Sequence, residues 1–238
     1  DAVRPRLSRS LVDRLESDPS PVRLTSQRQL DEIEKEVELG PMLESLDGIP
    51  YVRVRGANGA VREVRAGGFL EPGDSLQTGP KGNARLAFED GAQALVAKDT
   101  TVAYKRGEGG VSVVEMGEGE VRALVPAAEA SPVPADEVKK RPRFMIRTRS
   151  AVMGVRGTDF VVRSQAGSAS VHTLSGEVEV ALDELDLGGA GTVRVAQNQF
   201  ADAFTEGRVL NKARPFETGP FMTEFHQRHP KLERLWNA

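Results

Sequence analysis

The chain has 238 residues, a formal net charge of −3 and a pI near 5.8. This length suits one large β-domain with extensions, or two small domains. The acidic balance argues against a dedicated nucleic-acid-binding protein, which carries a basic excess. The complete lack of cysteine excludes disulfides, thiolate metal sites and a cysteine nucleophile.

Apolar residues make up 39% of the chain and aromatic residues only 5%, so a core must be built mainly from Val, Leu and Ala. The 24 glycines and 14 prolines indicate many turns. No stretch approaches the ~18 consecutive apolar residues of a spanning helix. The sequence also shows no signal-peptide core, and a start at Asp1 suggests a processed or trimmed terminus. We therefore expect a soluble chain.

Residues 1–48 are expected to form an N-terminal helical extension. A short helix is predicted over about 8–16, and a second helix begins near Ser26 and ends before Gly40. The second helix places three apolar residues on one narrow face, which would lie on the β-domain or on a partner: Leu30, Ile33 and Val37.

Residues 49–210 change to short alternating runs typical of half-buried strands, such as 51–55 and 61–65. Asn58-Gly59 between these two runs predicts a hairpin turn. Glycine-rich turns recur about every ten residues after that. The region is therefore predicted to be all-β, a short-strand sandwich or a solenoid-like stack. A proline-rich, polar stretch at about 125–143 is expected to be a mobile loop.

Two motifs in this region carry a family resemblance. The first is Leu70-Glu-Pro-Gly-Asp-Ser-Leu-Gln-Thr-Gly79 with Asp90-Gly91 downstream, and the second is Gly154-Val-Arg-Gly-Thr-Asp-Phe160. Their order and spacing resemble the FecR-like domain, a periplasmic module of Gram-negative bacteria, over about residues 50–200. The residues that carry this signature are Gly73, Asp74, Thr78, Gly79, Asp90, Gly91, Gly154, Arg156, Gly157, Thr158 and Phe160.

The resemblance implies an extracytoplasmic, non-catalytic module that works by binding. In the best-known members the domain lies between an inner-membrane helix and a receptor-contacting segment, and it relays receptor occupancy to a sigma factor. This sequence shows neither a transmembrane helix with an anti-sigma segment nor a recognisable receptor-docking domain after residue 210. The resemblance therefore favours an interaction or scaffold protein of the cell envelope.

Residues 211–238 are predicted to form a C-terminal helical tail that Pro230 interrupts. Its apolar residues either pack back on the domain or dock a partner: Phe221, Phe225, Leu232, Leu235 and Trp236. Packing back is favoured, because exposing so much aromatic area is costly.

We expect no catalytic, cofactor or metal site. His226 and His229 could share a helix face, but Pro230 disturbs that geometry and no third zinc ligand has recognisable spacing. His172 stands alone in a strand. Arg156, between two glycines, would either satisfy its donors locally or hold an anion, and the local role is the commoner one.

Three functional hypotheses follow. The first is a protein-binding envelope module, with an envelope protein or a second copy of the chain as partner. The second is the periplasmic relay of a sigma-factor regulator. The third is a peptidoglycan or glycan binder, which needs exposed aromatic platforms such as Tyr51, Tyr104 or Trp236.

Overall fold

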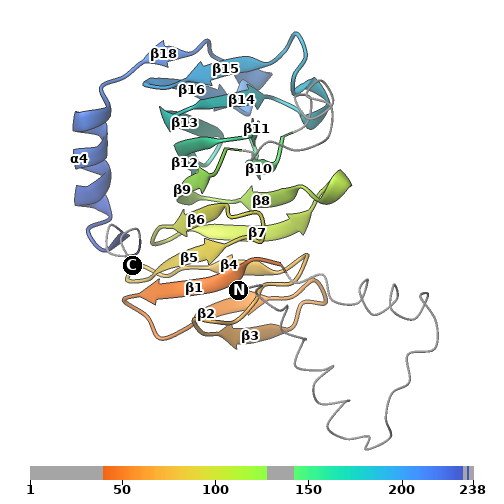
Figure 1. Cartoon of the computed structure of the whole chain (residues 1–238), viewed down its shortest axis with the longest axis vertical. Coiled ribbons are helices and arrows are strands. Elements are labelled where there is room, and N and C mark those ends of the chain that lie inside the picture. The colour runs from red at the N-terminus through yellow and green to blue at the C-terminus, as the bar shows by residue number, and fades with distance from the viewer. Residues whose placement is uncertain (1–39, 128–141, 233–234, 236–238) are drawn as a thin grey trace, which may run out of the picture. The chain divides into compact units, whose positions relative to one another are not determined.

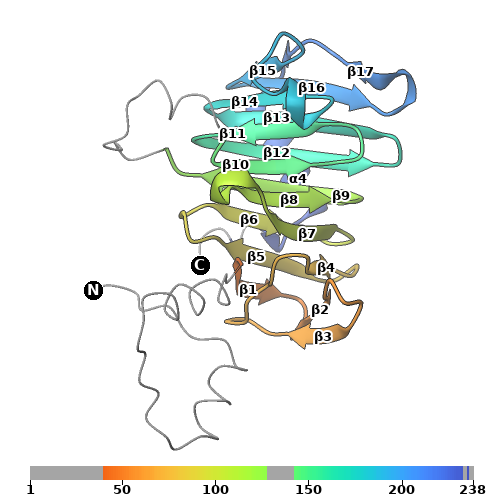
Figure 2. The same ribbon diagram turned by 90° about the vertical axis from the view of Figure 1, so that its right-hand side faces the viewer.

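The computed structural model describes residues 40–127, 142–232 and 235. In this part of the chain the strands form two nine-stranded sheets that pack face to face (Figures 1 and 2). The all-β prediction is confirmed, and a helix, α4 (Thr218–Arg228), follows the last strand as expected for the C-terminal end. The helices expected at 8–16 and 26–39, with Leu30, Ile33 and Val37, lie outside the described residues. None of the helices in the described ranges is both long and apolar enough to cross a membrane.

The first sheet, sheet A, runs in the order β1-β5-β6-β9-β12-β13-β16-β17, with β18 also paired to β16. Every pair in it is antiparallel. Its strands are β1 (Met42–Asp47), β5 (Asn83–Ala87), β6 (Gln93–Val96), β9 (Gly119–Val125), β12 (Thr158–Gln165), β13 (Ser168–Ser175), β16 (Gln199–Phe204), β17 (Val209–Leu210) and β18 (Arg214–Pro215).

The second sheet, sheet B, runs in the order β15-β14-β11-β10-β8-β7-β4-β2-β3. Its pairs are antiparallel except β8 with β10, which are parallel. Its strands are β2 (Val52–Arg55), β3 (Val61–Val64), β4 (Ser75–Gln77), β7 (Thr101–Arg106), β8 (Ser112–Met116), β10 (Phe144–Arg147), β11 (Val152–Val155), β14 (Glu177–Ala181) and β15 (Val193–Ala196). Short 3₁₀ turns cover Glu108–Gly110, Glu184–Asp186 and Glu206–Arg208.

The strands of both sheets follow chain order along the stack, from β1–β3 to β15–β18 (Figure 1). Neighbouring strands in a sheet are nevertheless often far apart in sequence, as in the pairing of Met42 in β1 with Ala87 in β5.

Two boundaries differ from the sequence prediction. The β-domain begins with β1 at Met42 and not at residue 49, because Leu43 is fully buried and the strand pairs with β5. At the other end, β18 lies within the stretch 211–238 that was expected to be helical. Of the loop at 125–143, residues 128–141 lie outside the described residues.

The predicted hairpin turn is present where the sequence placed it. Asn58-Gly59 joins β2 to β3, with Gly59 at φ 82° and the Asn58 side chain accepting a hydrogen bond from the Ala60 amide at 2.9 Å. Asn198 adopts φ 61° between β15 and β16, the left-handed conformation that Asn tolerates. The hairpin prediction is confirmed.

The core lies between the two sheets and consists of the inward-facing residues of the strands in both sheets. Most are Val, Leu and Ala, with Phe88, Phe144 and Phe160 as the large fillers. Along β12, for example, Phe160 and Val162 point inward, whereas Asp159, Val161 and Arg163 belong to the outer face. The outer face of sheet A is thus built from a second, distinct set of side chains.

Candidate partner-binding site

The first family motif forms a turn held by buried hydrogen bonds. Asp74 is 2% exposed, accepts a hydrogen bond from the Glu71 amide at 2.8 Å and pairs with Arg62. Gly73 has φ 92°, which favours glycine there. Asp90 accepts a hydrogen bond from the Ala92 amide. Each of these residues closes a turn.

Thr78, directly after β4, joins the end of that strand to the turn between β6 and β7. Its hydroxyl donates to the Ala97 carbonyl at 2.6 Å and accepts from the Thr100 amide at 3.0 Å. The neighbouring Gly79 carbonyl accepts from the Asp99 amide. Thr78 and Thr100 are both buried, so these bonds satisfy polar groups that have no access to water.

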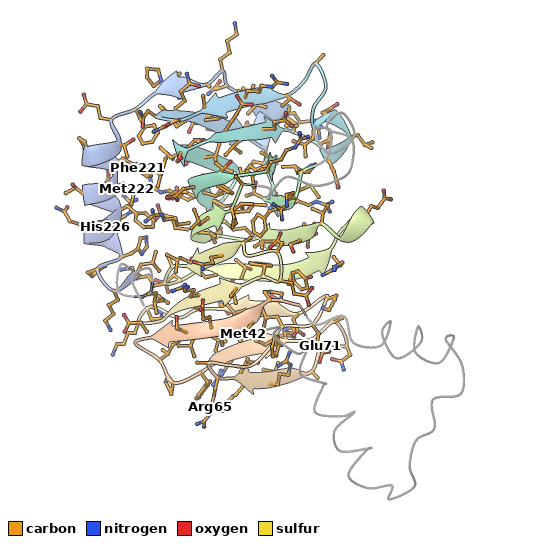
Figure 3. The ribbon with its side chains drawn as sticks, viewed as in Figure 1. Met42, Arg65, Glu71, Phe221, Met222 and His226 are labelled. Atoms are coloured by element: carbon orange, nitrogen blue, oxygen red, sulfur yellow. The ribbon has the colours of Figure 1, made fainter. Side chains whose placement is uncertain are left out.

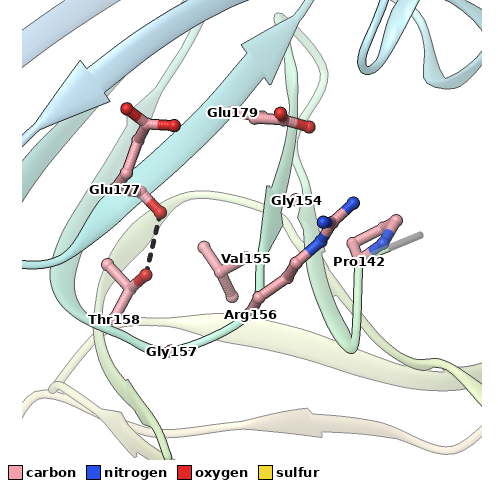
Figure 4. A pocket seen from close by; sticks show the side chains of 8 residues that line it. All are labelled: Pro142, Gly154, Val155, Arg156, Gly157, Thr158, Glu177 and Glu179. Atoms are coloured by element: carbon pink, nitrogen blue, oxygen red, sulfur yellow. Dashed lines mark hydrogen bonds between the residues drawn. The ribbon is translucent and has the colours of Figure 1, made fainter. Parts of the chain in front are cut away.

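The second motif forms the close connection between β11 and β12. A Cβ on Gly157 would come 2.8 Å from Ala127 Cα, and one on Gly154 would come 3.1 Å from Pro142 Cβ. These glycines therefore allow close approach and do not need a left-handed backbone. Thr158 donates to the Glu177 carbonyl of β14 at 2.8 Å (Figure 4), and Phe160 is fully buried.

Arg156 differs from the other signature residues. Its side chain lines a pocket of about 200 Å³ together with Pro142, Glu177 and Glu179 (Figure 4). It forms no hydrogen bond or ion pair with any described residue. Glu177 and Glu179 face Arg194 at 3.9 and 3.8 Å. The guanidinium is thus available to a ligand or partner.

A larger apolar depression adjoins this pocket. It measures about 580 Å³ and shares Pro142 with the Arg156 pocket. Met145, Leu185 and Leu187 supply its apolar lining, and the Leu185 side chain is 97% exposed. We call the two hollows together the Pro142 groove. It is lined by Arg106, Gly107, Glu108, Val111, Pro142, Met145, Arg147, Gly154, Val155, Arg156, Gly157, Thr158, Glu177, Glu179, Glu184, Leu185 and Leu187.

The C-terminal tail lies on the outer face of sheet A. Phe225, Leu232 and Leu235 are at most 4% exposed and pack with Leu95 and Val161 of the sheet. Figure 3 shows Phe221, Met222 and His226 along the helix. The structure therefore covers these expected docking residues with the chain's own sheet, while Trp236 lies outside the described residues.

A cluster of charges fastens the tail, and sequence reasoning missed it. Glu120 of β9 is 6% exposed, and its carboxylate accepts from Arg163 of β12 at 3.1 Å, from Arg228 at 2.9 Å and from His229 Nε2 at 2.6 Å. Burial by itself would raise the pKa of Glu120, but the His229 hydrogen bond and the Arg163 and Arg228 charges outweigh it and lower the pKa to about 2. We call these four residues the Glu120 clasp.

The sequence contains the charged residues of the clasp but does not indicate that Glu120 is buried. Charged residues recur at outward positions of strands, as at Glu120 and Arg122 of β9, and such charges usually face solvent. Arg122 indeed pairs with Asp159 across the same face at 2.7 Å. Only the position of α4 distinguishes the buried Glu120 from an ordinary surface carboxylate.

His172, to which no role was assigned, lies in an aromatic cluster at the start of α4. Its ring stacks on Phe221 at 4.2 Å and on Phe200 at 5.2 Å, and Phe216 meets it edge-on. Burial, reinforced by the charge of Arg163, lowers the pKa of His172 to about 4. The ring is neutral at pH 7 and acts here as an aromatic packing element.

Comparison with known proteins agrees with the motifs. Residues 74–179 match the model of the FecR protein family, whereas no curated protein matches the chain. Two crystal structures of a proposed anti-sigma factor from Parabacteroides distasonis ATCC 8503 are similar, at 20% and 19% identity with TM-scores of 0.47 and 0.49. The alignments cover 62% and 64% of each chain, less than two thirds of the solved proteins. The family model thus matches the region of the chain that contains most of the first motif and all of the second.

Proposed function

We propose that this chain is a non-catalytic, extracytoplasmic binding module whose partner is another protein of the cell envelope. The partner docks in the Pro142 groove. The observation that carries this proposal is the position of Arg156, a signature residue whose guanidinium has no partner among the described residues although it lines a pocket. The other signature residues hold turns, strand connections or the core.

The two outer faces of the sandwich support the same choice. Sheet A is covered by α4 across β6, β12 and β13. Sheet B offers a depression with exposed Leu185, beside the Arg156 guanidinium, which has no partner among the described residues. An interface of this kind favours a partner that inserts an apolar side chain near Met145 and presents a carboxylate to Arg156.

The finer role that we favour is signal relay and not passive scaffolding. The Glu120 clasp holds α4 on sheet A through a small number of side chains, so a displacement of the helix is a discrete event that a second protein can detect. The glycan alternative is less well supported, because Tyr104 is 3% exposed and packs in the core against Phe88.

A photocrosslinking amino acid placed at Leu185 in the source organism tests the proposal. We expect one discrete protein adduct, and we expect Arg156→Glu introduced into the same chain to reduce it strongly. A crosslinker at Val61 is the matched control, because Val61 is also exposed, at 58%, but lies on β3 at the other end of the stack.

Adducts of equal pattern at Leu185 and Val61, or a Leu185 adduct that ignores Arg156→Glu, would contradict the assigned surface. The identity of the adduct then separates the two roles. A receptor or a sigma-factor regulator supports relay, whereas a structural envelope protein supports scaffolding.

A further inference from the structure

We propose that the chain binds a phosphate group in a second, basic pocket at the C-terminal end of α4. This pocket measures about 190 Å³. It lies between the turn before β5, the turn after β6 and the end of the helix, and it is lined by Pro80, Lys81, Asn83, Lys98, Arg228, His229, Pro230 and Lys231. It is separate from the Pro142 groove, with which it shares no residue.

The charged side chains that line the pocket are all basic. Lys81, Lys98 and Lys231 each contribute an ammonium group, and no carboxylate is among the lining residues. None of the three lysines forms an ion pair with a described residue, whereas Lys105 elsewhere on the fold pairs with Glu115 at 2.8 Å. Three unpaired cations around one hollow create a local positive potential in a chain of net charge −3.

Nearby carboxylates form no ion pair with these lysines in the described residues. Glu120 is already engaged by Arg163, Arg228 and His229. Asp47, opposite Asn83 in the β1–β5 ladder, and Asp99, next to Lys98, do not reach ion-pair distance of these lysines. The lysine charges therefore remain available to a bound anion.

Two buried polar side chains in the lining are incompletely satisfied. His229 is 5% exposed; because the ionised Glu120 carboxylate can only accept, His229 Nε2 donates to it, and Nδ1 is left without a partner. Asn83 is 4% exposed, and its Oδ1 also has no partner. Both atoms are acceptors, so the group that would satisfy them must carry a proton, such as a water or the P–OH of monohydrogen phosphate.

The chemistry of the pocket selects among anions. Several ammonium groups converging on a small hollow suit a compact oxyanion with more than one negative charge, and lysine binds phosphate as a point charge. The Asn83 side-chain amide nitrogen supplies a neutral N–H donor. A solvated lysine face would need neither the hollow nor the unpaired buried groups.

The test is a protein-observed NMR titration with sodium phosphate, in which sodium chloride keeps the ionic strength constant. We expect saturable shifts centred on Lys98 and Lys231. The double variant K81Q/K98Q should bind phosphate about tenfold more weakly, since each partly exposed charge contact contributes roughly two- to fivefold. K212Q is the matched control, because Lys212 is exposed and lies outside the pocket. It should leave the affinity unchanged.

Vesicles containing phosphatidic acid separate the two sources of the phosphate group. Co-sedimentation that inorganic phosphate reverses, and that K81Q/K98Q abolishes, assigns the pocket to a lipid headgroup; phosphate binding without co-sedimentation assigns it to a soluble ligand. Absence of saturable binding to either probe, or equal binding by K81Q/K98Q, overturns the proposal. Crosslinking from Leu185 is unaffected by these variants, so failure here is distinguishable from failure of the protein-binding role.

Discussion

Glu120 on β9 and His229 at the end of α4 are 109 positions apart in sequence, yet His229 Nε2 lies 2.6 Å from Glu120 Oε2. The two side chains are 8% and 6% exposed, so their contact is shielded from water. Arg163 and Arg228 complete the arrangement from a neighbouring strand and from the helix. This contact ties the end of the chain to the middle of sheet A.

Removing the Glu120 charge should therefore destabilise the fold and loosen α4. We expect Glu120→Gln to lower the free energy of unfolding by about 3 kcal/mol, because two arginines and a histidine lose their shared partner in a buried position. Chemical denaturation measures the change, and limited proteolysis reports on the helix, which should be cut faster than the sheets.

Glu115→Gln is the control for that experiment. Glu115 pairs with Lys105 and Arg147, but its side chain is 34% exposed. The expected cost is at most about 1 kcal/mol, since exposed ion pairs contribute little. Equal costs for the two variants would show that burial of Glu120 has no energetic consequence.

His172 should make stability depend on pH in the mildly acidic range. Its pKa is lowered to about 4 in the folded protein, while the unfolded chain takes up the proton near pH 6.5. The unfolded state thus binds more protons between these values, and stability falls as the pH drops from 6.5 towards 4. His172→Phe keeps the aromatic stack and removes this fall.

Denaturation midpoints of the wild type and His172→Phe, measured from pH 7.5 to pH 4, test this pH dependence. The wild type should lose stability over this range, and His172→Phe should be nearly flat until the Glu120 carboxylate contributes. Glu120 has a folded pKa of about 2, so its own contribution is lost only as the pH falls from about 4.5 to 2. If the stability of the wild type and of His172→Phe changed in parallel with pH, His172 would not be the source of the pH dependence.

Alanine variants of Gly176 and Gly59 distinguish the stability cost of backbone strain from the cost of a steric clash. Both have positive φ, at 84° and 82°, so alanine is strained equally at either position. A Cβ on Gly176 would lie 2.4 Å from the Gly157 carbonyl oxygen, whereas Gly59 has open space. We expect Gly59→Ala to cost about 1 kcal/mol and Gly176→Ala about 3 kcal/mol or more.

Thermal unfolding of both glycine variants, followed by circular dichroism, gives the comparison. If the two costs agree within error, the second motif does not depend on close packing between Gly176 and the β11–β12 connection.

Phe225 anchors α4 through packing and not through charge. The side chain is 1% exposed and contacts the apolar strip of sheet A. Phe225→Ala should cost about 3 to 5 kcal/mol. Phe204→Ala, at a side chain that is 39% exposed, should cost clearly less. Hydrogen exchange of the α4 amides should accelerate in the first variant and not in the second.

Local sequence signals were sufficient for the fold class and the tight turns. The Asn58-Gly59 hairpin and the left-handed Asn198 depend on residues within a few positions of one another, so pattern and propensity determine them. The turns of the first motif also depend on nearby residues: Asp74 accepts a hydrogen bond from an amide three residues away, and Gly91 adopts φ 80° in its own turn. Such features can be predicted because their physical cause is contained in the local sequence.

Features that depend on contacts between distant segments could not be predicted. Nothing near Glu120 in sequence indicates that α4 will bury it, and His172 appears isolated until Phe200 and Phe221 are placed on either side. The start of the domain at Met42 was missed for a similar reason, since β1 is defined by its partner β5. The basic pocket likewise combines Lys81, Lys98 and Lys231, which only the folded chain brings together.

The path of the C-terminal tail has a mechanical consequence. The chain leaves sheet A at β18, beside the last strands, and α4 then runs back along the stack (Figure 1). Beyond α4, the Leu235 carbonyl accepts a hydrogen bond from Arg85 of β5 at 2.7 Å. Late and early layers are thus strapped together on one side. Tension that pulls those layers apart would therefore act on the contacts of the tail as well as on the ladders between neighbouring strands.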